Sequence, residues 1–183
     1  MGSSKTANAL MTKFNYEEKG YEVLLLKPSI DNRDGVATIK SRIGLQSEAR
    51  LINKNDNLYI IFTNMSCDEN SLPDVIIIDE SQFLTRMQIE DLKRIAMIFN
   101  IPVFCYGLRT DFKSNLFEGS KRLFEIADSI SEIKSVCHCG DKAIINARIK
   151  DGKIIYYGDQ IDIGANDKYI GLCYKCWIEG NLT

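Results

Sequence analysis

The sequence predicts an α/β fold, in which a parallel sheet carries helices on both faces, followed by a small C-terminal domain of another kind. Apolar runs typical of buried strands alternate with amphipathic helices along the first part of the chain, which indicates a parallel sheet. Near residue 133 this alternation gives way to two close cysteine pairs. A length of 183 residues suits one domain with a small appendage. We therefore expect an α/β domain at residues 1–132 and a second domain at residues 133–183.

The first predicted elements are a helix and a buried strand. Apolar side chains recur at helical spacing over residues 7–14, and Gly20 is a typical helix C-terminal cap. The run YEVLLLKP at residues 21–28 is almost continuously apolar and ends at a proline, as a buried parallel strand does. Residues 29–58 are polar and mixed, and residues 58–62 fit either a strand or a helix.

Two further strands and two helices continue the pattern. The run PDVIIIDESQF at residues 73–83 is the second buried strand, and the helix after it begins with a capping-box pattern at Thr85 and Gln88. The apolar inner face of this helix consists of Ile89, Leu92, Ile95, Ala96 and Phe99. The run IPVFCYG at residues 101–107 is the third buried strand, and residues 121–127 read as another short helix.

The composition is that of an ordinary globular protein, with 45% hydrophobic and 26% charged residues. A net charge of -2 argues against a nucleic-acid partner, whereas small anionic ligands need only local positive charge. No apolar run approaches the ~18–20 residues of a membrane span, and the N-terminus lacks an apolar signal-peptide core. We expect a cytoplasmic protein without a membrane partner, whose six cysteines are reduced or metal-bound.

Lys5 and Thr6 match the end of a phosphate-binding loop of the Walker type, G-x-x-x-x-G-K-[ST]. Ser4 stands where the second glycine of that pattern belongs, and the first glycine would lie upstream of Met1. A lysine before a threonine at any helix start would look similar, so the rest of the chain has to decide.

Asp79 and Glu80 follow the second buried strand directly. Strands of nucleotide-binding sheets deliver an acid at their carboxyl end, where it can hold magnesium, and a second acid can act on the attacking nucleophile. The alternative is a solvated strand end, for which one acid would serve as well as two. Together with Lys5 and Thr6 one strand–helix unit earlier, the two acids favour a magnesium–phosphate site.

Four of the six cysteines form two close pairs on either side of a predicted hairpin, at residues 143–149 and 153–157. The pairs consist of Cys137, Cys139, Cys173 and Cys176. Four thiolates at such spacing suit a closed, structural zinc site, although the first pair is tighter than the usual Cys-x-x-Cys. The alternatives are four unrelated buried thiols, or His138 in place of one cysteine ligand.

Several motifs together resemble a known family: SRIGLQS at residues 41–47, DESQF at 79–83, YGLRTDF at 106–112 and the cysteine pairs. With them the sequence is similar, over practically its whole length, to the zinc-containing type II thymidine kinases, with the bacterial branch closest. The resemblance implies a P-loop NTPase-like sheet and a zinc-binding domain with a lasso loop. It also implies transfer of the γ-phosphate of ATP to the 5′-hydroxyl of thymidine, which gives thymidine monophosphate in pyrimidine deoxynucleoside salvage. Mg²⁺ with ATP, structural Zn²⁺, a homo-oligomer (tetramer or dimer) and feedback inhibition by thymidine triphosphate are further implications.

In that family, positions matching this chain surround the ATP phosphates. Lys5 would contact the phosphates, Thr6 and Asp79 would hold magnesium, and Glu80 would be the catalytic general base that takes the proton of the sugar hydroxyl. Positioning and charge neutralisation would carry most of the rate, because a carboxylate is a weak base. The matching ATP-binding positions are Met1, Gly2, Ser3, Ser4, Lys5, Thr6, Asp31, Asn32, Arg33, Asp79, Glu80, Ser81 and Gln82.

The resemblance also assigns positions that bind thymidine, through apolar side chains and through a lasso loop that meets the base mainly by its backbone. The matching positions are Leu108, Phe112, Phe117, Gln160, Ile161, Asp162, Ile163, Gly164 and Tyr169. A loop that reads a base by its backbone must be rigid, and zinc at its two ends would supply rigidity. For the aromatic side chains of Phe83 and Phe117 the alternative is core packing.

The sequence departs from the family in two places. The strand and first glycine that precede the phosphate loop in family members are missing ahead of Met1, and we expect the native gene to encode roughly ten more residues there, an apolar strand. Ser4 replaces a glycine, which adds strain of about 1–3 kcal/mol or lowers ATP affinity if that position needs a glycine conformation.

Two rival functions come from other classes of protein. A catalytically impaired regulatory homologue would bind thymidine or its triphosphate without turnover, and only the altered phosphate loop supports it. A zinc-ribbon ATPase acting on nucleic acid is disfavoured by the net charge. Assays of phosphate transfer to thymidine and to other nucleosides separate all three.

Overall fold

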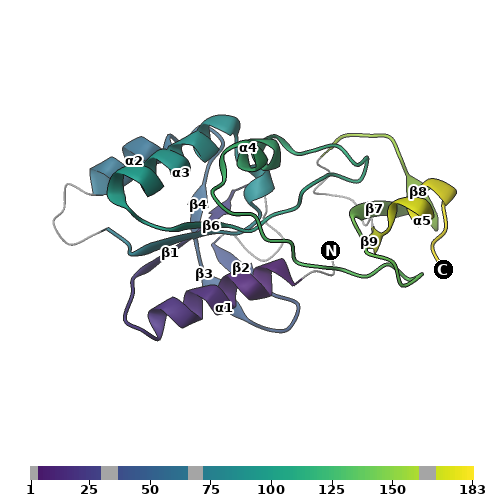
Figure 1. The fold of residues 1–183 in the computed structure, drawn as a ribbon, viewed down its shortest axis with the longest axis horizontal. Helices are drawn as coiled ribbons and strands as arrows, with labels where there is room; N and C mark the ends of the chain where they lie inside the picture. The colour runs from purple at the N-terminus through teal and green to yellow at the C-terminus, as the bar shows by residue number, and fades with distance from the viewer. Residues whose placement is uncertain (1–3, 30–36, 66–71, 161–167) are drawn as a thin grey trace. The chain divides into compact units, whose positions relative to one another are not determined.

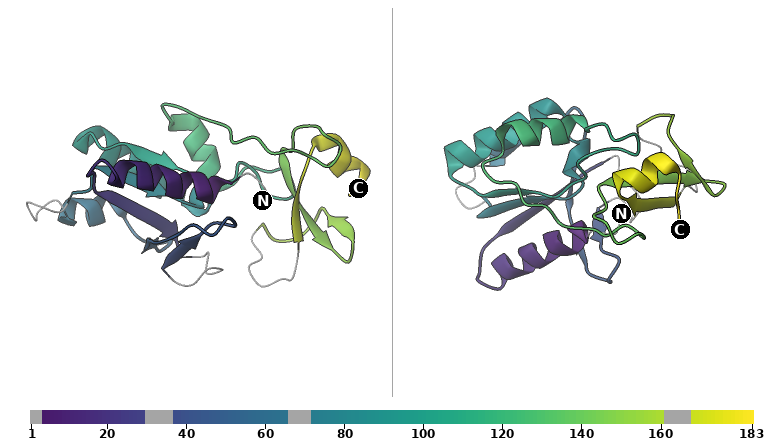
Figure 2. Two further views of the ribbon diagram at one scale, coloured as in Figure 1. Left: turned by 90° about the horizontal axis from the view of Figure 1, so that it is seen from below. Right: turned by 45° about the vertical axis from the view of Figure 1, so that its right-hand side comes forward.

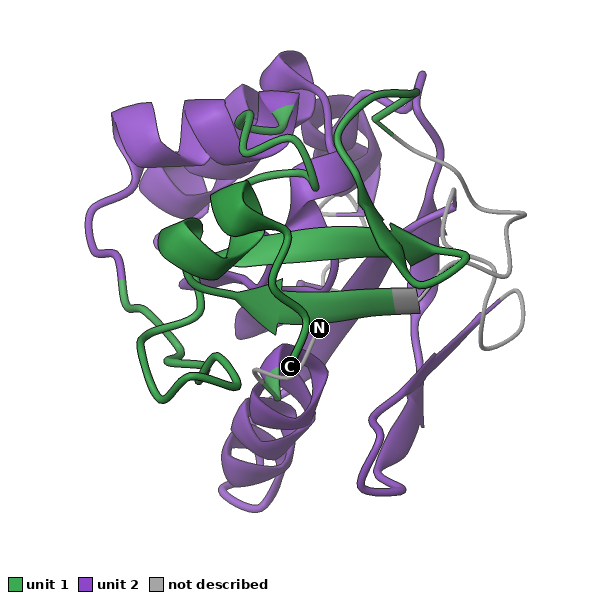
Figure 3. Cartoon of the chain, turned by 90° about the vertical axis from the view of Figure 1, so that its right-hand side faces the viewer, with its two compact units in different colours: residues 1–4, 109–117, 131–183 green, residues 5–108, 118–130 purple. Residues whose placement is uncertain are grey.

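The computed structural model describes residues 4–29, 37–65, 72–160 and 168–183. The chain forms two compact units, shown in different colours in Figure 3. Residues 5–108 and 118–130 make up what we call the α/β unit, and residues 1–4, 109–117 and 131–183 make up the C-terminal unit. Residues 109–117 thus belong to the C-terminal unit although they precede residue 132, and the domain boundary at that residue stays a prediction.

A four-stranded parallel sheet, in the order β4-β1-β5-β6, forms the centre of the α/β unit (Figure 1). Its strands are β1 (Val23–Pro28), β4 (Arg50–Ile52), β5 (Val75–Ile78) and β6 (Val103–Cys105). In register, Leu26 of β1 pairs with Ile78 of β5, which pairs with Cys105 of β6. The three predicted buried strands are therefore confirmed as parallel neighbours, and β4 is an addition that the sequence analysis did not predict.

Helices cover both faces of this sheet, as predicted (Figure 1). Ile76 and Ile78 of β5 pack against α2 (Leu58–Met65) and α3 (Arg86–Phe99). Val75 and Ile77, which point the other way because side chains alternate along a strand, pack in the cluster with Ala9 and Leu10 of α1 (Lys5–Glu17). Residues 58–62, for which strand and helix were both open, are helical.

A two-stranded antiparallel ribbon of β2 (Thr38–Lys40) and β3 (Gln46–Glu48) lies within the stretch that the sequence analysis described only as polar and mixed. Ile39 of β2 is buried in the same cluster as Ala9 and Leu10. The buried Lys27 at the end of β1 donates to the carbonyl oxygen of Thr38 at 3.1 Å. An apolar contact and a hydrogen bond thus attach the ribbon to α1 and to the sheet.

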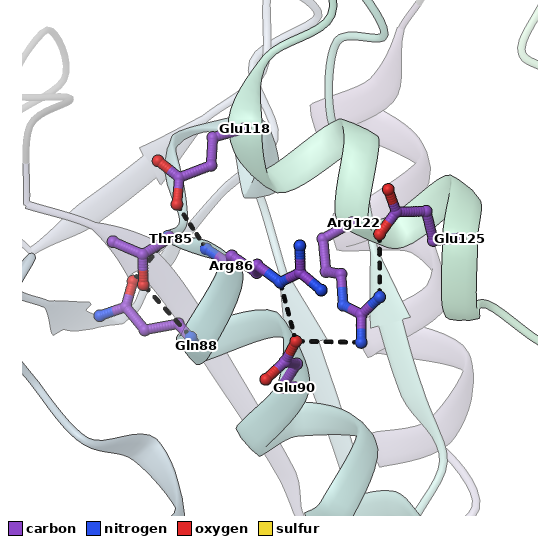
Figure 4. A network of polar contacts seen from close by, with 7 residues as sticks. All are labelled: Thr85, Arg86, Gln88, Glu90, Glu118, Arg122 and Glu125. Atoms are coloured by element: carbon purple, nitrogen blue, oxygen red, sulfur yellow. Dashed lines mark hydrogen bonds and ion pairs between the residues drawn. The ribbon is translucent and has the colours of Figure 1, made fainter.

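The beginning of α3 carries the capping box that the sequence predicts (Figure 4). The Thr85 hydroxyl accepts from the Gln88 backbone N–H at 3.2 Å, and the Gln88 side-chain oxygen accepts from the Thr85 N–H at 3.1 Å. Glu118, the first residue of α4 (Glu118–Ile126), accepts from the Arg86 N–H at 2.8 Å. The capping of α3 therefore also fixes the start of α4, which begins three residues earlier than predicted.

The C-terminal unit contains an antiparallel sheet, in the order β8-β7-β9, and one short helix (Figure 2). Its elements are β7 (Ile145–Lys150), β8 (Lys153–Ile155), β9 (Lys168–Leu172) and α5 (Tyr174–Glu179). The predicted hairpin is confirmed as β7–β8, and its turn residues Asp151 and Gly152 both have positive φ, as a tight hairpin turn requires. In the described part of the chain no helix is long and apolar enough to cross a membrane.

The capping box yields a prediction about stability. Thr85→Ala removes the acceptor for the Gln88 N–H and should lower the free energy of unfolding by about 1 kcal/mol. Thr85→Ser keeps a hydroxyl at the same place and should stay close to wild type. Denaturant titration of the three proteins measures the difference, and equal losses in both variants would contradict a capping role.

Candidate nucleotide and metal sites

The carboxyl end of β5 and the start of α1 meet in a cluster of polar side chains. Asp79 follows β5 and is only 4% exposed, and its carboxylate accepts a hydrogen bond from the Thr6 hydroxyl in the first turn of α1. Lys5, the first residue of α1, lies close enough for its charge to act on both Asp79 and Glu80. The structure thus brings together the four residues that the sequence analysis combined into one site.

Burial sets the electrostatics of this cluster. Burial, together with the neighbouring charge of Glu80, raises the pKa of Asp79 to about 6; the Thr6 hydrogen bond, a hydrogen bond from the Glu80 backbone and the charge of Lys5 oppose this shift. Burial also lowers the pKa of Lys5; the charges of Glu80 and Asp79 oppose this shift, whereas Arg42 adds to it. Both charged groups are therefore held in surroundings that disfavour their ionised forms.

The Asp79–Thr6 pair fits magnesium. A carboxylate and a hydroxyl are the hard oxygen ligands that this ion prefers in proteins. A divalent cation beside Asp79 would also reverse the two effects, desolvation and Glu80 repulsion, that raise the pKa of this carboxyl.

Glu80 is held by its own backbone and by Gln82. Its φ of 52° and ψ of 36° lie in the left-handed region, where a residue other than glycine carries about 1–3 kcal/mol of strain. The Gln82 side-chain amide donates to Oε2 of Glu80 at 2.5 Å, and the Glu80 N–H donates to Asp79 Oδ1 at 3.0 Å. Strained residues of this kind cluster at active sites, which supports a functional role for Glu80.

Gln82 connects Glu80 to the segment that follows β6. It is only 1% exposed, and its side-chain oxygen accepts from the Leu108 N–H at 2.9 Å. A side chain at position 107 is excluded, because a Cβ on Gly107 would lie 2.7 Å from Ser81 Oγ and 2.9 Å from the Gln82 oxygen. The Leu108 carbonyl accepts from Ser120 Oγ at 2.6 Å, so the position of Leu108 is fixed from both sides.

In the C-terminal unit, an arginine that the sequence analysis did not predict brings two of the proposed thymidine positions together. Arg148 of β7 lies directly opposite Tyr169 of β9, so both side chains are on one face of the sheet. The Arg148 guanidinium lies 5.4 Å from the centre of the Phe112 ring. Nothing in the local sequence of β7 marks Arg148, because its role depends on a residue 36 positions earlier.

Some of the remaining predicted positions lie in the described part of the chain, and the others lie outside it. Phe117 is buried and Phe83 is partly buried, so core packing accounts for part of each side chain's environment. Ser4 has a φ of 52°, the left-handed conformation for which glycine is best suited. Ten predicted positions lie outside the described residues: Met1, Gly2, Ser3, Asp31, Asn32, Arg33, Ile161, Asp162, Ile163 and Gly164.

The four predicted cysteines converge in the C-terminal unit. The sulfur atoms of Cys137, Cys139, Cys173 and Cys176 all lie within 4.8 Å of one another. Burial acts to raise the pKa of Cys137, but hydrogen bonds from the backbone N–H groups of Cys139 and Cys173 help to lower it to about 6. Four thiols this close together are compatible with structural zinc. His138 instead has its Nε2 3.2 Å from the Asn181 carbonyl oxygen.

Comparison with known proteins agrees with this geometry. A sequence profile described as thymidine kinase matches residues 1–177. The chain is 44% identical to the thymidine kinase of Enterobacteria phage T4, over 98% of this chain and 92% of the phage protein. It is 46% identical to the thymidine kinase of Zymomonas mobilis, again over 98% of this chain and 92% of that protein. The thymidine kinase of Photobacterium profundum is 41% identical, over 98% of this chain and 93% of its own length.

The raised pKa of Asp79 gives a prediction about stability and pH. The folded chain holds the Asp79 proton up to about pH 6, whereas the unfolded chain releases it near pH 3.8. The free-energy penalty for burying the charged carboxylate therefore reaches its full size above pH 6. Asp79→Asn should therefore raise the free energy of unfolding at pH 7.5, by a few kcal/mol at most, and the gain should shrink between pH 6 and 4. Urea titrations in magnesium-free buffer measure this. An Asp79→Asn gain that grew as the pH fell would refute it.

Proposed function

The chain belongs to the thymidine kinase family and is an enzyme that phosphorylates thymidine; from this premise we propose how its residues act. The proposed reaction transfers the γ-phosphate of ATP to the 5′-hydroxyl of thymidine, giving thymidine monophosphate. The observation that supports it best is the cluster of Lys5, Thr6, Asp79 and Glu80, in which Asp79 is buried and the other three are partly buried. It combines a cation for phosphate, oxygen ligands for magnesium and a carboxylate base at one end of the sheet.

We propose that Glu80 takes the proton of the 5′-hydroxyl as that oxygen attacks phosphorus. The hydrogen bond from Gln82 fixes the direction of its carboxylate, and the left-handed backbone holds the residue at the strand end. Lys5 would neutralise negative charge on the phosphates, and its partial desolvation makes that attraction stronger than it would be in water. Magnesium bound with ATP supplies further charge neutralisation, and Thr6 and Asp79 are the residues that would hold it.

We propose that Phe112 and Tyr169 of the C-terminal unit, together with Phe117, Leu108 and Gln160, bind the nucleoside. The cation–π contact of Arg148 with Phe112 supports this assignment, because it helps to hold the ring that would contact the base. Ser81 and Gln82 are assigned to the ATP side by the family resemblance. The same resemblance assigns residues 1–3 and 31–33 to the ATP side and residues 161–164 to thymidine, and all of these lie outside the described residues.

We also propose structural zinc at the four cysteines and a homo-oligomer, tetrameric or dimeric, in the cytoplasm. Thymidine triphosphate is the proposed feedback inhibitor, and neither a nucleic acid nor a membrane is a proposed partner. The cysteine geometry supports zinc. The other statements rest on the family resemblance, and the net charge of -2 adds support for the absence of a nucleic-acid partner.

The catalytic proposal is tested by phosphate transfer from ATP. Wild type should phosphorylate thymidine in preference to the other nucleosides. Glu80→Gln should leave ATP and thymidine binding largely intact and lower kcat by about 10²–10⁴-fold, as loss of a general base does. The matched control is Glu48→Gln, at an exposed glutamate of β3, which should keep full activity. Near-normal turnover of Glu80→Gln would remove Glu80 from the mechanism, and thymidine binding without turnover in wild type would favour a regulatory protein.

The zinc proposal is tested by metal analysis. We expect one zinc ion per chain in wild type and much less in Cys173→Ser, because a closed site needs all four thiolates. Cys173→Ser should also weaken thymidine binding more than ATP binding. Cys105→Ala, at a cysteine outside the cluster, should keep the zinc. Wild type with well under one zinc per chain and full activity would contradict the proposal.

A further inference from the structure

We propose that Asp111 is a positioning residue for the nucleoside: its carboxylate joins the turn that carries Phe112 to Gln160, and this link keeps both in place for binding. The inference rests on the proposed function, since it takes Phe112 and Gln160 as nucleoside-binding residues. It adds a residue, and a specific hydrogen bond, that the family resemblance does not assign.

One oxygen of the Asp111 carboxylate closes a tight turn around Phe112. Oδ1 accepts from the backbone N–H groups of Lys113 and Asn115, each at 2.9 Å. The Asp111 N–H donates to the Asn115 carbonyl at 2.9 Å, and the Ser114 N–H donates to the Asp111 carbonyl at 3.1 Å. An aspartate that bonds the backbone just after it is a typical turn former, so residues 111–115 form a well-defined loop.

The other oxygen of the carboxylate reaches across the unit. Oδ2 accepts from the Gln160 side-chain amide at 2.9 Å, from a residue 49 positions later in the chain. Asp111 is 3% exposed, and a buried carboxylate is tolerated only where hydrogen bonds replace its water. Three N–H groups meet this demand, and the Gln160 amide is one of them. Loss of that amide would leave Oδ2 without this donor.

A second tie joins the same turn to the same segment. Lys113 Nζ donates to the Gly158 carbonyl at 3.0 Å and lies 5.7 Å from the centre of the Phe112 ring. A Cβ on Gly158 would lie 4.0 Å from that ring. Both sequence neighbours of Phe112 therefore bind residues 158–160, and the ring lies at the junction. An intact link should hold ring and segment together, and a broken one should release both.

The experiment reverses the polarity of the link. Gln160→Glu places two carboxylates against each other and should break it. The double variant D111N/Q160E should restore it with donor and acceptor exchanged, because an amide then faces a carboxylate again and the amide oxygen can still accept from the turn. Gln160→Glu should raise the KM for thymidine about tenfold or more, the scale of a lost charge-assisted hydrogen bond, with the KM for ATP within about twofold. The double variant should recover most of the loss.

Two further variants complete the design. Gln160→Ala removes the amide without adding charge and should raise the KM for thymidine in the same direction, which keeps the proposal testable if Gln160→Glu folds poorly. Tyr157→Glu adds a carboxylate at an exposed position directly before residues 158–160 and should change neither KM. Unfolding midpoints for all variants separate a positioning role from a loss of stability, because only the former predicts a change confined to thymidine.

The outcomes separate this inference from the proposed function. Failure of wild type to phosphorylate thymidine would refute the function, and calorimetric thymidine binding would still compare the variants. Wild type that binds no thymidine would overturn both. An active wild type whose Gln160→Glu variant changes both KM values alike, or whose double variant recovers nothing, would overturn the role of Asp111 alone.

Discussion

The complete burial of β5 is the constraint on which the α/β unit depends. Its four residues are all buried, with alternate side chains packed in clusters on the two faces of the sheet. Polar side chains are therefore disfavoured within the strand, and the first polar side chain comes where the strand ends, at Asp79. Parallel pairing fixes that end: the Asp79 N–H donates to the Leu26 carbonyl at 3.1 Å, and the Tyr106 N–H to the Ile78 carbonyl at 2.8 Å. The acids and the segment after β6 are placed by the same two strand pairings.

The charges at this strand end are unfavourable for the chain alone and would suit the proposed ATP and magnesium. Burial shifts the pKa of Asp79 upward and that of Lys5 downward, so each group is pushed toward its neutral form. Phosphate oxygens beside Lys5 and a cation beside Asp79 would remove both penalties at once. Burial of these two groups lowers the stability of the fold, as is usual for the residues of an active site, and this agrees with the proposed catalytic role of the cluster. The strained backbone of Glu80 belongs to the same pattern.

Sequence patterns predict those elements whose side chains repeat at a fixed period. The apolar runs of β1, β5 and β6 and the capping box of α3 are of this kind, and the spacing of Lys5, Thr6, Asp79 and Glu80 along that framework brought them into one site. The three-residue strand β4 has an exposed arginine and a single fully buried residue, so it is a strand only because β1 pairs with it. The contact of Arg148 with Phe112 and the hydrogen bond of Gln82 to Leu108 were not predicted for a similar reason. Each depends on a partner that tertiary folding supplies.

The C-terminal unit has to obtain rigidity by other means than a large hydrophobic core. Among its described residues the buried cluster contains six, of which three are cysteines of the proposed zinc site: Cys137, Cys173 and Cys176. Units with so little apolar burial usually need metal, disulfide or hydrogen-bonded links. In the proposed zinc site these thiols would be core residues and metal ligands at once, so loss of zinc would also disturb the packing of β7 and β9. The buried carboxylate of Asp111 supplies a second link, to Gln160 in the stretch that follows β8. A metal at the four cysteines would hold β7 and β9, and the charged hydrogen bond holds Gln160, so the proposed nucleoside-binding residues would be positioned without a larger core.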